Sequence, residues 1–305
     1  MNETVLSVRD LRKLYGKTVA VDGIQLEVQR GEIFGLLGPN GAGKTSTLEC
    51  VEGIRRPDGG AISVLGVDPT RDTRRLYNLI GVQLQASGMP AEMRVDEAMQ
   101  FFSAYHAVAP RYDLLQRLGL GEKRRSQCRE LSTGLQRRLA LALAMAHQPA
   151  LLLLDEPTAG LDVESRAQLH ELIQELREEG TTVILATHDM AEAEKMTDRV
   201  SILLRGKIVA TGTPRELTAT GAGLTKVSVR TEQSVLFQAD AAIPAVQKRA
   251  LQEEYVIYFS SDPGPTVAAI LQHLTAHNDR LIDLRVERPS LEERFLEITQ
   301  NGGAR

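Results

Sequence analysis

The segment that most constrains this chain is the octet Gly-Pro-Asn-Gly-Ala-Gly-Lys-Thr at residues 38–45. It follows a short apolar run at 33–37 that predicts a strand, and it leads into 45–51, which predicts a helix. Glycines at this spacing, closed by lysine and a hydroxyl residue, form the pattern of a phosphate-binding loop. A plain glycine-rich turn before a helix is the alternative. The strand–loop–helix context favours the phosphate site, and with it an α/β sheet.

The side chains of this phosphate loop have distinct expected roles. Glycine lets successive backbone N–H groups point at one anion, and the start of the following helix adds partial positive charge. The Lys44 ammonium can reach the outer phosphates of a nucleotide, and the Thr45 hydroxyl is placed to bind Mg²⁺. The expected nucleotide-binding residues of this segment are Gly38, Pro39, Asn40, Gly41, Ala42, Gly43, Lys44, Thr45 and Ser46.

Two acids end a second apolar run. Residues 151–154 are four leucines, which predict a strand buried on both faces of a parallel sheet, and Asp155 and Glu156 follow at once. Ligands of open α/β sheets bind at the carboxyl ends of the strands, so both acids should face the phosphates. Asp155 is the expected partner of Mg²⁺, and Glu156 is the expected base for an attacking water. A helix cap or a solvated turn is the alternative for such acids.

Composition limits the class of protein. The chain has 305 residues, 42% of them hydrophobic and 25% charged, which suits one large domain and a smaller one. A net charge of -4 argues against a nucleic-acid partner. Cys50 and Cys128 are too far apart to indicate a zinc site or a disulfide framework, so a reducing compartment fits. No signal peptide is expected, and His147-Gln148-Pro149 splits the most apolar stretch below the length of a membrane span.

The chain divides near residues 218–223, a stretch of small residues. We expect a nucleotide-binding domain at 1–220, with a helical subdomain at about 86–130, and an α+β domain at 221–305. The expected strands lie at 5–8, 19–21, 25–28, 33–37, 151–154, 182–187, 200–204, 208–211, 226–230, 255–260 and 282–286. The expected helices lie at 45–51, 95–107, 114–118, 135–147, 165–179, 265–277 and 290–298.

Further segments narrow the family. Residues 131–135, Leu-Ser-Thr-Gly-Leu, resemble the signature of the ATP-binding cassette (ABC) family, and 155–162, Asp-Glu-Pro-Thr-Ala-Gly-Leu-Asp, resemble its Walker B and D-loop. Thr-His-Asp at 187–189 falls where the family has its switch histidine. Gln85 falls at the position of the Q-loop glutamine, and Tyr15 at that of the adenine-stacking aromatic. The motifs occur in the family's order over residues 4 to about 217.

The resemblance implies an α/β fold, a P-loop NTPase ABC cassette with a mixed sheet core, a helical subdomain and a small C-terminal α+β domain. It implies a catalytic set of Glu156, His188 and Lys44. It implies a magnesium set of Thr45, Gln85 and Asp155, serving ATP as the nucleotide. Each assignment has a simpler alternative: Tyr15 as a core aromatic, His188 as a surface residue at a strand end, Gln85 as a solvated loop residue.

The signature segment implies a dimer. Ser132 and Gly134 precede an apolar helix, and the helix start can bind an anion. In the family this site contacts the γ-phosphate held by a second copy of the chain, so that two chains enclose two ATP molecules. Thr133 and Leu135 replace the usual glycine and glutamine, which predicts weaker nucleotide-driven dimerisation. Capping of a helix is the alternative role for Ser132, and also for Asp162 at the expected dimer seam.

The end of the chain indicates the type of transporter. Residues 282–298 resemble the tail of ATPases that serve ABC-2-type exporters of drugs, antibiotics or lipids, although an ordinary amphipathic closing helix is the alternative. The expected function is an ATP-hydrolysing subunit that powers a separate integral membrane permease, bound peripherally at the cytoplasmic face of the cell membrane. The rivals are a non-transport ABC ATPase acting on ribosomes or DNA, and a nucleotide-dependent switch that scarcely hydrolyses ATP.

Overall fold

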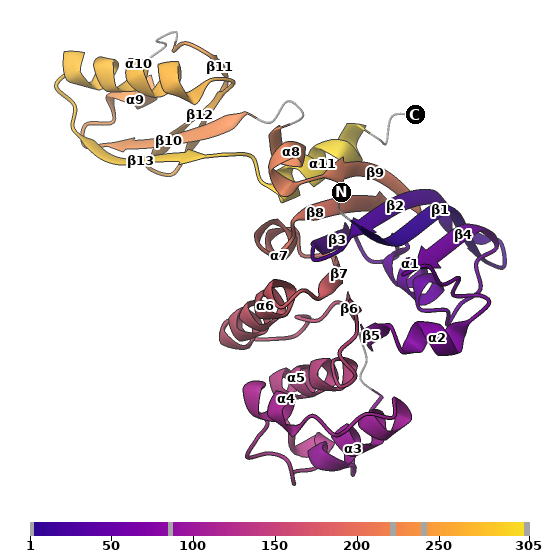
Figure 1. Cartoon of the computed structure of the whole chain (residues 1–305). Helices are drawn as coiled ribbons and strands as arrows, with labels where there is room; N and C mark the ends of the chain where they lie inside the picture. Colours follow the sequence, from indigo (N-terminus) through magenta and orange to yellow (C-terminus); the bar gives the residue numbers. More distant parts are fainter. Residues whose placement is uncertain (1–2, 85–87, 220–223, 239–242, 302–305) are drawn as a thin grey trace. The chain divides into compact units, whose positions relative to one another are not determined.

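The structure is a computed structural model that describes residues 3–84, 88–219, 224–238 and 243–301. The chain forms two compact units, Met1–Pro214 and Arg215–Arg305. The first unit contains two sheets and the second contains one, and each unit has its own buried core (Figure 1).

A six-stranded sheet forms the centre of the first unit. Its strands are β3 (Ile33–Leu37), β5 (Ile80–Gln83), β6 (Leu151–Asp155), β7 (Thr182–Thr187), β8 (Arg199–Leu204) and β9 (Lys207–Gly212). They lie in the order β5-β6-β7-β3-β8-β9, and all neighbours are parallel except the β8–β9 hairpin. The prediction of fully buried parallel strands is confirmed for β6 and β7, in which every residue is buried.

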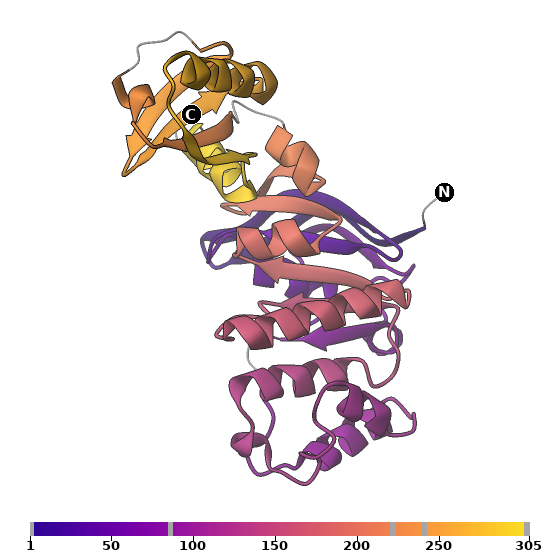
Figure 2. The same ribbon diagram turned by 90° about the vertical axis from the view of Figure 1, so that its left-hand side faces the viewer.

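Alternate residues of the central strands feed two separate cores. Leu152 and Leu154 pack with the helices α5 (Thr133–Ala144) and α6 (Val163–Glu178) on one face. Leu151 and Leu153 pack on the other face with α1 (Lys44–Val51) and an antiparallel sheet. The continuous leucine run of β6 is therefore explained by burial between two layers (Figures 1 and 2).

The antiparallel sheet has the order β2-β1-β4 and consists of β1 (Thr4–Tyr15), β2 (Thr18–Gln29) and β4 (Gly59–Val64). The prediction of separate short strands at 19–21 and 25–28 is wrong, because β2 runs through both. Asp22-Gly23, a pair that is typical of turns and suggests a break between the two, lies instead at a β-bulge within the strand. Gly23 has φ +69°, and the ladder shifts register there while pairing continues on both sides.

Short helices and one 3₁₀ turn occur between these strands along the chain. They are α2 (Thr73–Tyr77), α3 (Val95–Tyr105), α4 (Tyr112–Arg117), a 3₁₀ turn at Cys128–Glu130, and α7 (Met190–Met196). Helix α5 begins two residues before its expected start, because Ser132 caps it. It ends at Ala144 rather than at His147, because the chain turns at Gln148, whose φ is +55°, before Pro149.

The second unit contains a four-stranded antiparallel sheet with α9 (Val235–Gln238) and α10 (Pro263–Ala276) on one face (Figure 1). Its other elements are α8 (Pro214–Ala219), β10 (Thr225–Thr231), β11 (Val246–Gln252), β12 (Tyr255–Ser260), β13 (Leu281–Glu287) and α11 (Leu291–Asn301). The strand order is β11-β12-β10-β13. Leu236 of α9 and Ile270 of α10 pack on Val227 and Val256 of the sheet.

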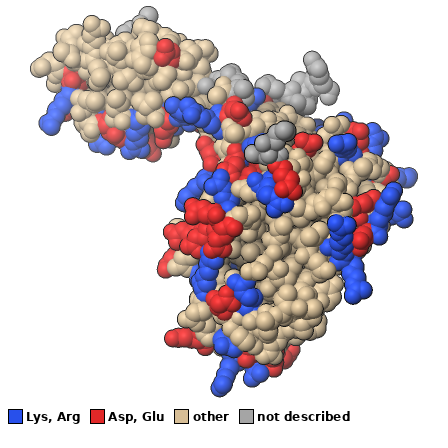
Figure 3. Space-filling view, viewed as in Figure 1, with Lys and Arg blue, Asp and Glu red and all other residues tan. Residues whose placement is uncertain are grey.

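Charged side chains of both signs lie on the face of the molecule that Figure 3 shows. Figure 3 shows Lys and Arg interspersed with Asp and Glu on the visible face, with no broad area of one sign. Both cysteines are buried and free. Within the ranges that the structure describes, no three His, Cys, Asp or Glu side chains group as metal ligands, and no helix is long and apolar enough to cross a membrane.

Candidate active site

Three neighbouring strands, β6, β7 and β3, end at the same edge of the central sheet because they are parallel. The phosphate loop (residues 38–45) follows β3, the pair Asp155 and Glu156 closes β6, and His188 follows β7. Sequence segments more than a hundred residues apart therefore meet at one place. This is the position at which open α/β sheets bind their ligands.

The phosphate loop encloses a cavity of about 230 Å³. Lys44 is buried beside it, and its Nζ donates to the Gly38 carbonyl at 2.7 Å and lies 3.3 Å from Oε1 of Glu156. The cavity-lining residues are Tyr15, Ala20, Pro39, Asn40, Gly41, Gly43, Lys44, Thr45, Ser46 and Glu156. A buried ammonium in a cavity of loop amides is suited to an anion.

Two glycines of the loop are required by the surrounding backbone. A Cβ at Gly38 would lie 2.3 Å from the Leu203 carbonyl oxygen. A Cβ at Gly43 would lie 2.4 Å from the Ala20 carbonyl oxygen, and Gly43 also has φ +109°. Larger residues at these positions would displace the loop, so the curl of its backbone depends on both glycines.

Asp155 and Thr45 form the second part of the site. The Thr45 hydroxyl donates to Oδ2 of Asp155 at 2.9 Å, and Asp155 is 3% exposed. Its Oδ1 is buried and has no hydrogen-bond partner within the described part of the chain. Burial raises the pKa of Asp155. The Thr45 hydrogen bond lowers this pKa, but the nearby negative charge of Glu156 raises it further, and the net shift is upward. A buried carboxylate oxygen without a hydrogen-bond partner, beside a threonine hydroxyl, suits a bound cation.

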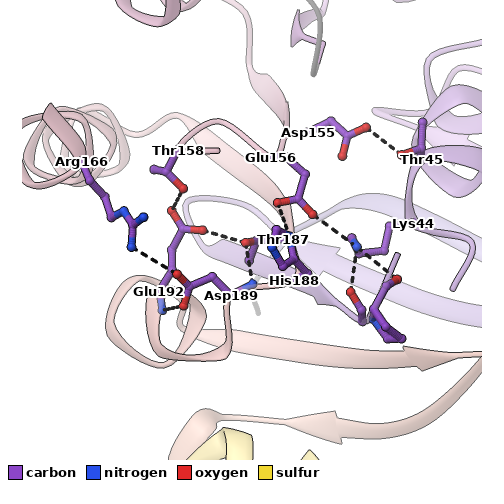
Figure 4. Close-up of polar contacts among 12 residues, drawn as sticks. Lys44, Thr45, Asp155, Glu156, Thr158, Arg166, Thr187, His188, Asp189 and Glu192 are labelled. Atoms are coloured by element: carbon purple, nitrogen blue, oxygen red, sulfur yellow. Dashed lines mark hydrogen bonds and ion pairs between the residues drawn. The ribbon is translucent and has the colours of Figure 1, made fainter. Parts of the chain in front are cut away.

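Glu156 and His188 lie against each other, as Figure 4 shows. The His188 Nδ1 is 2.8 Å from Oε2 of Glu156, while the other carboxylate oxygen faces Lys44. Glu156 is 6% exposed, and the His188 side chain is 53% exposed. Glu156 also has φ +50°, a left-handed conformation that costs a non-glycine residue about 1–3 kcal/mol. Strain of this kind concentrates at functional sites.

Tyr15 lies at the rim of the cavity. Its side chain is 41% exposed, and its hydroxyl donates to Glu49 at 3.2 Å. The exposure shows that Tyr15 is not a core aromatic, and it leaves a ring face available for stacking. Gln85 lies outside the described residues.

The signature residues Ser132 and Gly134 lie at the start of α5 and make contacts within their own subunit. Ser132 is the N-cap of α5 and accepts a hydrogen bond from the Leu135 amide at 3.3 Å. Gly134 is buried, and a Cβ there would lie 2.9 Å from the Ser165 hydroxyl oxygen. Asp162 caps α6 in the same way. Ser132 and Gly134 are not among the described residues that line the phosphate cavity.

Sequence reasoning missed some residues of this region. Ala20 of β2 lines the cavity, and Glu49 of α1 holds the Tyr15 hydroxyl. Glu192 of α7 binds both loops behind the catalytic candidates. The spacing of Asp189 and Glu192 signals only a helix start, and nothing local in the sequence indicates that the Glu192 carboxylate is buried.

Comparison with known proteins agrees with this geometry. The family model described as ABC transporter matches residues 21–159. Nod factor export ATP-binding protein I of Ralstonia nicotianae is 34% identical over 97% of this chain and 94% of its own length. The linearmycin resistance ATP-binding protein LnrL of Bacillus subtilis is 32% identical over 97% of this chain and 98% of its own length.

Solved structures show the same fold over about 70% of this chain. The ATP-binding subunit of an ABC transporter superposes with a TM-score of 0.65 at 26% identity, covering 70% of this chain and 91% of that one. The cbiO1 protein of Clostridium perfringens, part of the ABC transporter complex cbiONQ, gives a TM-score of 0.62 at 30% identity, covering 72% and 92%. The predicted fold class is thereby confirmed. This chain belongs to the ABC transporter family, as one of its ATP-binding, ATP-hydrolysing subunits.

Proposed function

We propose that this chain hydrolyses Mg·ATP to power export through a separate membrane permease. The observation that carries the proposal is the convergence of Lys44, Asp155, Glu156 and His188 around the phosphate loop. The direction of transport rests on the relatives, which are named for Nod factor export and for linearmycin resistance. ABC ATP-binding subunits work with membrane permease components, and we place this chain at the cytoplasmic face of that permease.

The residues present fit a magnesium nucleotide. Lys44 and the loop amides would hold the phosphates, with Tyr15 stacking on the base. Thr45 and Asp155 would hold Mg²⁺, since a hydroxyl and an orphaned carboxylate oxygen lie together there, and Gln85 is proposed as a third contact. When bound, Mg²⁺ neutralises charge on the phosphate oxygens.

Glu156 would orient the attacking water and accept its proton, because its carboxylate is buried at the cavity wall between Lys44 and His188. His188 would then support the γ-phosphate with its exposed imidazole. The Lys44 ammonium faces the same carboxylate at 3.3 Å, so its move toward a phosphate would free Oε1 of Glu156 for the water.

A second copy of the chain is the proposed partner at the phosphate cavity. Ser132 and Gly134 at the start of α5 would contact the nucleotide of the other copy, with Asp162 at the seam. Thr133 is exposed at this helix start, whereas Leu135 packs against the core. Leu135 therefore contributes to its own subunit's packing in place of the polar contact that glutamine would offer.

An apolar groove of about 330 Å³ is our candidate dock for the permease. Its walls include Ile54, Tyr77, Val82, Leu84, Phe102 and Tyr105. Several of these are exposed, with Ile54 at 51% and Tyr105 at 65%. A helical segment of the permease would cover this surface, because aromatic and aliphatic side chains exposed together mark protein interaction sites.

Two measurements on the purified full-length chain test the proposal. Release of phosphate from Mg·ATP should fall by roughly 10³-fold in Glu156→Gln while ATP binding persists. Glu178→Gln, on the exposed side of α6, is the matched control and should keep wild-type turnover. Isolation of the chain from membranes should bring down an integral membrane protein. Co-isolation with ribosomes instead, or ATP hydrolysis indifferent to Glu156→Gln, would contradict the proposal.

A further inference from the structure

The carboxylate of Glu192 lies outside the phosphate cavity but contacts the loops that form it. Glu192 lies in the first turn of α7 and is 4% exposed. Its Oε1 accepts from the Thr158 hydroxyl at 2.6 Å and from the His170 Nε2–H at 2.9 Å, and its Oε2 accepts from the Thr187 hydroxyl at 2.7 Å. Figure 4 shows the Thr158 and Thr187 contacts beside the Glu156–His188 pair.

The donors come from separate segments of the chain. Thr158 lies two residues after Glu156, in the loop that leaves β6. Thr187 is the last residue of β7 and directly precedes His188. The third donor, His170, comes from α6. One carboxylate therefore joins the loop that follows the proposed base to the strand end that precedes the proposed γ-phosphate contact.

The Glu192 carboxylate is held in its ionised form. Burial alone would raise the pKa of Glu192, but the hydrogen bonds from His170, Thr158 and Thr187 outweigh burial and lower it below its ordinary value. Hydrogen bonds to a charged group are stronger than those between neutral groups and rigidify a buried network. An ionised carboxylate is an acceptor only, and here it meets only donors.

Helix α7, which carries this carboxylate, is itself fixed to its surroundings. Oδ1 of Asp189 caps the helix by accepting from the Glu192 amide at 2.9 Å, and Oδ2 of Asp189 lies 3.3 Å from Arg166 of α6. The Asp189 amide donates to the Thr187 hydroxyl at 3.1 Å. The carboxylate therefore acts from a rigid support, so a shift of either loop would break a short hydrogen bond.

Glu156 needs such support because its backbone is strained. Its φ of +50° persists only where neighbouring structure determines it. We propose that Glu192 is a positioning residue for ATP hydrolysis, holding the Thr158 and Thr187 loops together so that Glu156 and His188 keep their contact of 2.8 Å. This inference rests on the proposed function, in which Glu156 is the base.

Glu192→Gln is the direct test in the full-length chain. Glutamine keeps the shape but removes the charge, and its NH₂ group donates where the carboxylate accepts, so the hydroxyl that it meets must turn to accept and the charge-assisted hydrogen bond is lost. Displacement of a catalytic group by about 1 Å costs up to roughly 100-fold, so we expect kcat for ATP to fall roughly 10- to 100-fold. ATP affinity should stay within about twofold, because the phosphate loop is untouched.

Paired threonine variants separate positioning from general destabilisation. Thr187→Val keeps the volume of the side chain and removes its hydroxyl, and it should lower kcat in the same way, whereas Thr187→Ser should restore most of the activity. Thr197→Val is the matched control, because Thr197 is buried at the end of the same helix and donates at 2.7 Å to the Ala193 carbonyl. It should keep kcat within about twofold despite a similar loss of stability.

Folded Glu192→Gln and Thr187→Val proteins with wild-type kcat would overturn the proposal. So would an equal fall of kcat in Thr197→Val, or a failure of Thr187→Ser to restore activity. These outcomes are distinct from failure of the proposed function. In that case Glu156→Gln itself would leave hydrolysis unchanged, and the effect of Glu192→Gln could not then be ascribed to Glu156.

Discussion

Glu52 should make the first unit less stable as pH rises through neutrality. Glu52 is 2% exposed at the end of α1, and its Oε2 has no hydrogen-bond partner among the described residues. Burial, with the negative charges of Asp155 and Glu49, raises the pKa of Glu52 from 4.5 to about 8. The native state therefore keeps a proton that the unfolded chain releases.

The sign and size follow from proton linkage. Below pH 4.5 Glu52 is protonated in both the folded and the unfolded state, and its contribution to the free energy of unfolding is at its maximum. This contribution is lost as the pH rises toward 8, because the unfolded chain releases the proton first. Across this window the free energy of unfolding falls by about 1.4 kcal/mol per pH unit, or about 2.5 kcal/mol between pH 5 and pH 7. Glutamine has nearly the same shape as glutamic acid and does not ionise. Glu52→Gln should therefore remove this dependence of the free energy of unfolding on pH.

Urea unfolding followed by circular dichroism at pH 5, 6 and 7 measures the effect. The advantage of Glu52→Gln over the wild type should grow by about 2.5 kcal/mol from pH 5 to pH 7. Glu178→Gln, whose side chain is exposed, should follow the wild-type curve. A constant difference between Glu52→Gln and wild type across this range would refute a buried, proton-bearing Glu52.

Other substitutions give equally direct outcomes. Gly43→Ala should abolish ATP binding measured by titration calorimetry, because its Cβ would lie 2.4 Å from the Ala20 carbonyl, and retained affinity would contradict the packing argument. Leu152→Ala, at a fully buried site of β6, should lower the free energy of unfolding by about 2–5 kcal/mol in urea, and a loss below about 1 kcal/mol would show a collapsed or absent cavity. Thr133→Gly should strengthen the ATP-induced dimerisation of a Glu156→Gln protein, seen by sedimentation, because a side chain at this position narrows access to phosphate. Unchanged dimerisation in the Thr133→Gly variant would contradict this explanation.

Local patterns made the central fold predictable. A strand that is buried on both faces requires an apolar side chain at every position, as in β6. A loop that curls around a phosphate requires glycine where other backbone approaches closely, as at Gly38 and Gly43. The limits of β2 were not predictable in this way, because Asp22-Gly23 is equally typical of a turn and of a bulge. Pairing with β1, which no local pattern reveals, decides between them. Strand β11 was missed for a related reason, since Gln-Lys-Arg within it suits an edge strand but not a buried one.

The candidate site likewise has a part that the sequence predicts and a part that depends on tertiary packing. Residues that would touch the nucleotide follow strand ends in a fixed order, so their types and spacing could be interpreted from sequence. The contact of Glu156 with His188 joins positions 32 residues apart, and the Glu192 contacts span up to 34. Their geometry depends on how α6 and α7 pack, which the sequence pattern does not specify. A strained Glu156 backbone makes that packing part of the chemistry, because the strain must be opposed by contacts outside the motif. Motif residues grafted onto a sheet without a buried acceptor at position 192 should therefore bind ATP and hydrolyse it poorly.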